Sequence, residues 1–169
     1  IQKGMPNLLV MDSKGSAGAY TGRCNLYDPV DATMTDISSD LGTPADIFTG
    51  SPSDFFSFAN WQGVGYMVNN VNQIYQWAGR GNAVVVFNVQ VNTTDAKTNH
   101  LDTCRYIFIK DDRMILLDTV EFGDWHPQRC RYSPVLQTDF SASGASYVDA
   151  PTPQRIMTAG MVGKDIAVF

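Results

Sequence analysis

The clearest periodic pattern in the chain lies within residues 53–78. Apolar residues recur there at three- and four-residue spacing, with polar residues between them, which is typical of one apolar stripe on a helix; the stripe comprises Trp61, Val64, Met67, Val68, Val71, Ile74, Tyr75 and Ala78. Gly79 follows in a position that commonly ends a helix. Gly63 and Gly65 each cost about 1 kcal/mol in a helix interior, so the helix begins after Gly65 or these glycines allow a close backbone contact. The pattern predicts one main helix over about residues 60–78.

After the predicted helix, apolar and polar residues alternate with the period of two that is typical of β-strands. Residues 83–91 predict one strand, and residues 100–110 and 113–124 predict two more, joined by a tight turn at Asp111 and Asp112. Together they predict a three-stranded antiparallel meander on which the helix can pack. We therefore expect an α+β fold, built on an antiparallel, strand-rich sheet or a barrel-like cone.

The two ends of the chain carry turn signals. Residues 1–57 contain short apolar runs between turns rich in Asp, Gly and Pro, and they predict short strands without a helix of normal length. Residues 133–169 predict an irregular tail with an apolar end that can pack on the core or on a neighbouring subunit. The chain has 169 residues, of which 44% are hydrophobic, so we expect a single domain over residues 1–169.

Charge and composition argue against several classes of partner. The chain has 12 basic and 17 acidic residues, a net charge of −5 and no basic run, so nucleic acid is not an expected partner. No apolar run approaches the roughly 20 residues of a membrane helix, so we expect no membrane span. The first residue is Ile1, which indicates a processed mature chain, a polyprotein product or an excerpt. The sequon at Asn92 is compatible with an extracellular location, but the sequence leaves the location open.

The cysteines and histidines give little support for a metal or redox site. Cys24, Cys104 and Cys130 allow at most one internal disulfide, and a bridge between Cys104 and Cys130 is as compatible with the sequence as buried free thiols. The two histidines lie 26 positions apart and no Cys-x-x-Cys spacing occurs. We therefore expect no metal site and no cofactor.

The two long predicted strands could carry acid-base chemistry. If alternation holds along both strands, one face of each contributes to an apolar pocket that also contains carboxylate, imidazole and phenol groups, with a carboxyl pKa raised by burial. The catalytic candidates are His100, Asp102, Tyr106 and Asp118. The predicted substrate-binding residues are Phe108, Met114, Leu116 and His126. In this interpretation His100 is the acid or base, Asp102 orients it, and Tyr106 and Asp118 polarise the substrate.

A purely structural interpretation of the same residues stands beside the catalytic one. His100 and Asp102 are then residues at a strand end near a loop. Asp118 pairs with Arg105 or Arg131, since a structural ion pair perturbs an acid as readily as catalysis does.

The segment CRYIFIKDDRMILLDTVEF, residues 104–122, follows the predicted helix and the first predicted strand. This order of elements resembles the C-terminal half of the NTF2-like fold, whose members include scytalone dehydratase, limonene epoxide hydrolase and SnoaL-type cyclases. The resemblance covers residues 60–124. It implies a cone with a deep apolar pocket in which His, Asp and Tyr move protons on a hydrophobic substrate, without metal or organic cofactor. The family's long N-terminal helices have no counterpart in residues 1–57, and one strand after the last helix is missing.

Three functions are therefore considered. The first is a small-molecule pocket protein, such as a cofactor-independent lyase, isomerase or hydrolase acting on an apolar substrate, and it requires an enclosed cavity around Asp118. The second is a structural or assembly protein without catalysis, such as a viral coat, surface or filament subunit. The third is a carbohydrate-binding module, which requires an exposed Trp beside carboxylates. Whether the chain is an enzyme stays open; its expected partners are a small apolar ligand or other copies of itself, in a homo-oligomer.

Overall fold

The computed structural model describes residues 8–14, 21–38, 48–51, 53–91, 101–151, 154–163 and 165–169. These residues form β-strands and turns, and they contain no helix. Hence no helix in this part of the chain could span a membrane. The expected α+β class is wrong, because the described chain is built mainly from antiparallel strands.

The N-terminal sheet has β2 at its centre. Its four strands are β1 (Leu8–Lys14), β2 (Thr21–Asp28), β3 (Thr33–Asp36) and β4 (Phe48–Thr49). β1 pairs along the whole of β2, whereas β3 and β4 pair with opposite ends of β2. The short strands predicted for this region are confirmed within the described residues.

The region predicted to be helical forms a second four-stranded sheet. Its strands follow one another in chain order as β5 (Ser57–Trp61), β6 (Val64–Val68), β7 (Tyr75–Trp77) and β8 (Val84–Val86). The helix over residues 60–78 is therefore a wrong prediction. Gln62 and Gly63 have positive φ angles of 52° and 81° and form the two-residue turn that joins β5 to β6. Such a turn matches the twist of a hairpin and ends any helix.

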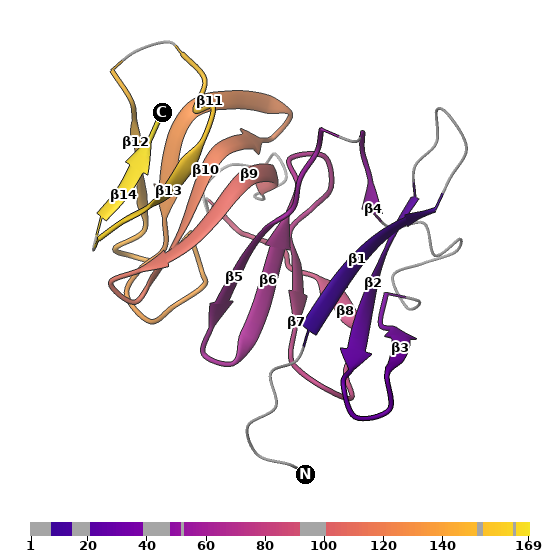
Figure 1. The fold of residues 1–169 in the computed structure, drawn as a ribbon. Coiled ribbons are helices and arrows are strands. Elements are labelled where there is room, and N and C mark those ends of the chain that lie inside the picture. Colours follow the sequence, from indigo (N-terminus) through magenta and orange to yellow (C-terminus); the bar gives the residue numbers. More distant parts are fainter. Residues whose placement is uncertain are drawn as a thin grey trace.

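The second sheet lies between two other sheets (Figure 1), which explains why its pattern looks helical. Tyr66 and Val68 pack into a core shared with β9 and β10, whereas Met67 packs into a core shared with the N-terminal sheet. Both faces of β6 are thus covered, so its sequence has no polar face. Short apolar runs of this kind cannot be separated from a buried helix by periodicity. Val71, placed on the predicted stripe, is 42% exposed.

The third sheet contains the two long strands. Its order is β12-β11-β10-β9, with β9 (Leu101–Lys110), β10 (Arg113–Glu121), β11 (Asp124–Tyr132) and β12 (Ser146–Asp149). The β9–β10 hairpin is confirmed, and its turn residues Asp111 and Asp112 have φ angles of 48° and 54°. The third strand of the meander is β11, because β8 belongs to the second sheet.

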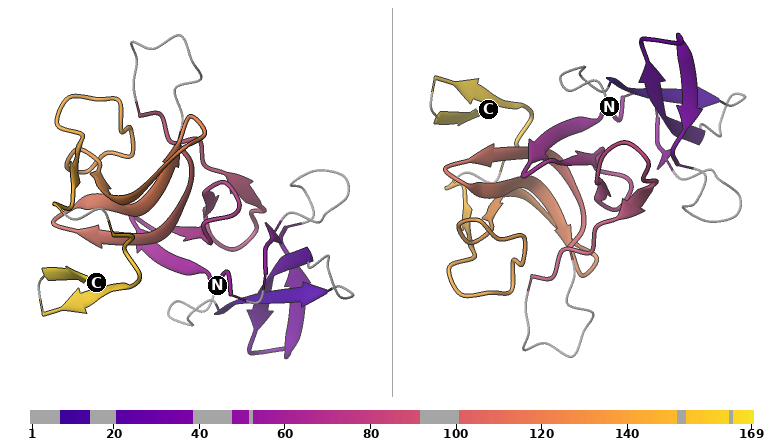
Figure 2. Two further views of the ribbon diagram at one scale, coloured as in Figure 1. Left: turned by 90° about the horizontal axis from the view of Figure 1, so that it is seen from above. Right: turned by 90° about the horizontal axis from the view of Figure 1, so that it is seen from below.

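The chain beyond residue 132 is less irregular than expected. It contributes β12 to the third sheet, and it then forms a two-stranded hairpin from β13 (Ala159–Val162) and β14 (Asp165–Val168). In both views of Figure 2 this hairpin, drawn in yellow, lies beside the third sheet and does not join it.

Candidate functional site

Three of the four predicted catalytic residues, Asp102, Tyr106 and Asp118, lie in the described part of the chain, and each has its own structural partner. His100 lies outside the described residues. The carboxylate of Asp102 accepts a hydrogen bond from the amide of Gly123 at 2.7 Å. The hydroxyl of Tyr106 donates to the carbonyl oxygen of Met157 at 2.7 Å.

Asp118 is fully buried, and both of its oxygens are occupied. The indole Nε1 of Trp125 donates to Oδ1 and the guanidinium Nε of Arg155 donates to Oδ2, each at 2.7 Å. The guanidinium of Arg155 also lies over the Trp125 ring, 5.1 Å from its centroid. The cation that pairs with Asp118 is therefore Arg155, where the sequence suggested Arg105 or Arg131.

The position of Asp118 results from an irregularity between β10 and β11. Leu117 pairs with Cys130 and Thr119 pairs with His126, so Asp118, with a φ of 54°, faces three residues of β11. One of them is Pro127, which has no amide hydrogen to donate to a ladder and is tolerated at bulges.

The bulge also supplies acceptors for the chain that follows. The carbonyl oxygen of Pro127 accepts the amide of Ile156 at 3.0 Å, and that of Gln128 accepts the amide of Ala150 at 3.0 Å. The bulge therefore fixes the segment that carries Arg155.

The predicted substrate-binding residues do not line a common pocket. Met114 and Leu116 are fully buried in the core shared by the second and third sheets, whereas Phe108 and His126 are half-buried. Alternation fails at Asp118, because Leu116, Leu117, Asp118 and Thr119 are all buried. Burial, followed by the negative charge of Asp118, holds the pKa of the Cys104 thiol well above its usual range. Cys24, Cys104 and Cys130 are all free.

A buried charge network lies farther along β10 and β11. Glu121, with 3% of its side chain exposed, accepts hydrogen bonds from Arg131, from Arg129 at 3.1 Å and from the Thr119 hydroxyl at 2.9 Å. Burial alone raises the pKa of Glu121, but the hydrogen bond and charge of Arg131, helped by Thr119 and Arg129, outweigh burial and lower it.

The same network extends to β12. Arg129 binds both carboxylate oxygens of Asp149, at 2.9 and 3.0 Å, and its guanidinium stacks 3.8 Å from the Tyr147 ring centroid. The hydrogen bond from Arg129 lowers the pKa of Asp149. The sequence did not predict this network. Of its four charged residues, Glu121 alone lies on a strand that the pattern predicted, so nothing in the sequence indicated that Arg129, Arg131 and Asp149 pair with it.

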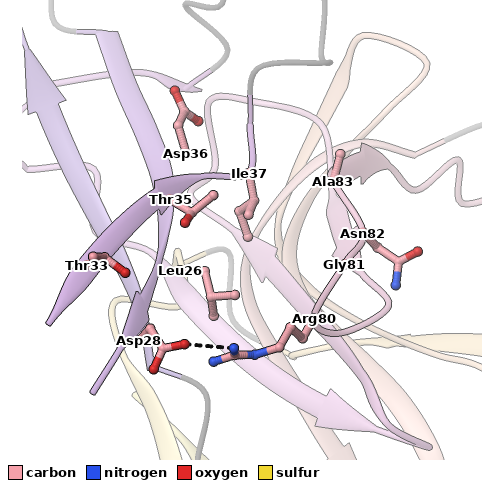
Figure 3. Close-up of a pocket in the computed structure, with 10 residues that line it drawn as sticks. All are labelled: Leu26, Asp28, Thr33, Thr35, Asp36, Ile37, Arg80, Gly81, Asn82 and Ala83. Carbon is pink, nitrogen blue, oxygen red and sulfur yellow. Dashed lines mark hydrogen bonds and ion pairs between the residues drawn. The ribbon is translucent and has the colours of Figure 1, made fainter. Parts of the chain in front are cut away.

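Three cavities among the described residues are considered, and Asp118 lines none of these three. The first has a volume of about 390 Å³ and lies between β2–β3 and the loop before β8 (Figure 3). An ion pair of 2.8 Å between Asp28 and Arg80 crosses one end of it. Two hydrogen bonds, first from the Val30 amide and then from Arg80, lower the pKa of Asp28.

The other two cavities border the second sheet. One, of about 420 Å³, is lined by Phe58, Tyr66, Trp77 and the glycines near them. The other, of about 300 Å³, is lined mainly by polar residues: Ser53, Asp54, Asn69, Asn70, Arg105, Tyr106 and Arg155. Tyr106 is the one predicted catalytic residue that lines a described cavity. No three His, Cys, Asp or Glu side chains of the described residues are grouped so that they could hold a metal ion.

Of the three tryptophans, Trp125 is the exposed one. It is 53% exposed, whereas Trp61 and Trp77 are each 6% exposed. Its indole nitrogen is already bound to Asp118 and one face carries Arg155, so a sugar ring could stack on the opposite face alone.

Comparisons of the chain with protein-family models, with curated proteins and with solved structures found no match. The resemblance to the NTF2-like fold therefore stays a prediction from sequence. One of the elements on which it rests, the helix over residues 60–78, is replaced by strands in the structure.

Proposed function

We propose that this chain is a non-catalytic assembly subunit that binds a second copy of itself through the β13–β14 hairpin. The observation that supports the proposal is an entirely apolar and largely exposed hairpin face. Ala159 pairs with Val168, and Met161 pairs with Ile166, so these four side chains share one face. Met157 lies just before β13, where the amides of Met157 and Thr158 both donate to the Phe169 carbonyl oxygen, and its side chain is exposed as well. We call Met157, Ala159, Met161, Ile166 and Val168 the hairpin face.

The hairpin face is too exposed for a two-stranded unit in water. Met157, Met161 and Val168 are 63%, 49% and 44% exposed. An isolated hairpin is marginally stable, and it gains stability when a further strand or layer covers its apolar face. Among the described residues, β13 and β14 pair only with each other. A covering layer from outside this copy would supply the missing burial.

The hairpin is held firmly at its base, which suits a preformed contact surface. The Met157 carbonyl accepts the Tyr106 hydroxyl, the Ile156 amide is bound to Pro127, and Arg155 is bound to the buried Asp118. Because these contacts fix the start of the hairpin, little additional conformational entropy is lost when a partner binds.

A second copy is the partner that this face fits best. An apolar face is complementary to itself, and a two-fold axis places the same patch on both sides of an isologous interface. The chain is acidic overall, with a net charge of −5, so contact through an uncharged face avoids repulsion between copies.

The catalytic interpretation has weaker support from the geometry and stays a prediction. An acid or base must reach its substrate, whereas Asp118 is fully buried with both oxygens hydrogen-bonded. If the interpretation is correct, Asp118→Asn and His100→Ala each lower turnover by at least about a hundredfold.

Light scattering over a concentration series tests the assembly proposal. We expect a mass of a dimer or larger for the unaltered chain and a monomer for Met161→Lys/Val168→Lys, since two buried ammonium groups destabilise an apolar interface. Val30→Lys is the matched control, because Val30 is 63% exposed on the turn between β2 and β3 and should leave the mass unchanged. A monomeric unaltered chain at all concentrations, or a double variant with the unaltered mass, overturns the proposal.

A further inference from the structure

The cavity of about 300 Å³ beside Tyr106 combines a positive and a negative side chain that do not pair with each other. Arg105 and Asp54 both line it, and within the described residues neither takes part in an ion pair. Asp54 accepts one hydrogen bond, from the Ser51 amide at 2.6 Å. Opposite charges that share a cavity without meeting leave both available to a ligand.

Asn70 also lines the cavity. Its Oδ1 has no hydrogen-bond donor, but this oxygen is fully buried, so a ligand in the cavity does not contact it. The backbone fixes its place: the Asn70 amide donates to the carbonyl of Cys104 at 2.9 Å, and φ is 64°, which asparagine tolerates better than most residues. Asn70 therefore shapes the wall of the cavity and is not a contact of the ligand.

Arg155 supplies further donors at the C-terminal side of the cavity. Its Nε is bound to Asp118, which leaves the two terminal nitrogens of the guanidinium without a hydrogen bond inside the described chain. Guanidinium groups bind carboxylates through paired N–H donors. Phe55, which is 79% exposed, provides an apolar wall.

The geometry points to a small zwitterion of the amino-acid type as the ligand of this cavity. Its carboxylate binds the guanidinium groups of Arg105 and Arg155, and its ammonium group donates to the carboxylate of Asp54. A simple anion such as phosphate fits less well, because Asp54 repels it. The volume is at the lower end of the range for small-molecule sites. The inference does not depend on self-association.

Calorimetric titration with three matched probes tests the site. The probes are L-valine, 3-methylbutanoate, which lacks the amino group, and isobutylamine, which lacks the carboxylate. We expect L-valine to bind in the millimolar range, at least about tenfold more tightly than either analogue, since each charge-assisted contact contributes about a factor of ten. Equal binding of all three probes, or no binding of L-valine, overturns the proposal.

Two variants assign each end of the ligand. Arg105→Gln should reduce L-valine binding toward the level of isobutylamine, because Arg155 alone then holds the carboxylate. Asp54→Asn, which retains an oxygen for the Ser51 amide, should reduce it toward the level of 3-methylbutanoate. Arg23→Gln is the control, since Arg23 is an arginine on β2 away from this cavity and should leave binding unchanged. Circular dichroism establishes that each variant is folded, and Arg105→Lys is the substitute if Arg105→Gln is not. Unchanged L-valine binding in the variants at Arg105 and Asp54 overturns the assignment.

Discussion

The third sheet and the β13–β14 hairpin differ in whether their side chains find contacts within the chain. In the sheet, Glu121 and Asp118 are buried, and each has its own arginine. The described residues of the hairpin include no buried charge, and the apolar face of the hairpin is open to solvent. One region is closed by contacts within the chain, while the other needs a contact from outside. The difference indicates where stability is generated and where association takes place.

The largest expected effect comes from opening the charge network of the sheet. Glu121→Ala leaves Arg129 and Arg131 close together without their shared anion. Since removing one member of a buried ion pair leaves an uncompensated charge, we expect the free energy of unfolding to fall by about 3–5 kcal/mol, measured by urea denaturation. Asp165 is an exposed carboxylate on the hairpin, so Asp165→Asn should change the free energy of unfolding by less than about 0.5 kcal/mol. If Glu121→Ala changes the free energy of unfolding by a similarly small amount, the buried charge network does not stabilise the sheet.

A smaller loss is expected where the sheet holds the base of the hairpin. In Asp118→Asn the amide nitrogen faces a donor, either Trp125 or Arg155, so one hydrogen bond becomes a donor–donor contact. We expect a destabilisation of about 1–3 kcal/mol. Trypsin should also cleave after Arg155 faster than in the unaltered chain, because that side chain has lost its buried partner. If urea denaturation shows the loss while the cleavage rate stays the same, Asp118 does not hold the hairpin.

Low pH should weaken the charge network around Glu121 and Asp149 in the unaltered chain. The pKa values of Glu121 and Asp149 are both lowered in the folded chain. Carboxylates of this kind stabilise the fold at pH values above their unfolded pKa, and the contribution is lost as the pH falls through the folded pKa. We expect the free energy of unfolding to decrease below about pH 4.5 and Glu121→Gln to flatten that decrease. A profile that is equally steep in this variant places the acid sensitivity elsewhere.

The smallest effect on stability is expected in the hairpin. Met161→Lys adds a charge to a side chain that is already 49% exposed, so the free energy of unfolding of the monomer should change by less than about 0.5 kcal/mol. The same substitution should weaken association in analytical ultracentrifugation. A large loss of monomer stability means that this side chain is part of the closed core, and the contrast between the two regions then disappears.

The sequence predicted the β9–β10 hairpin well because its signals are local. The two apolar-rich runs and the Asp111–Asp112 turn between them act within the hairpin itself. The prediction of the second sheet was wrong for the opposite reason, since β6 is covered on both faces by segments distant in sequence. Its apolar run carries no information about which residue faces which core.

The environment of Asp118 was only half predictable. Its apolar neighbours on β10 indicate burial, and the structure has it fully buried. Its partner could not be found, because Arg155 follows 37 residues later, after a turn-rich stretch. The bulge opposite Pro127 breaks the alternation that the predicted pocket required. The spacing of residues in the sequence does not predict an ion pair between an acid on a strand and an arginine that follows the last strand of the sheet.

The distance in sequence between Asp118 and Arg155 also matters during synthesis of the chain. All strands from β1 to β12 leave the ribosome before Arg155 is available, and domains generally begin to fold from the N-terminal side. Until that arginine emerges, the third sheet can close only by burying a carboxylate without its cation. Completion of the fold is thereby tied to translation of the C-terminal segment, and an unfinished chain keeps this side of the sheet accessible to chaperones and proteases.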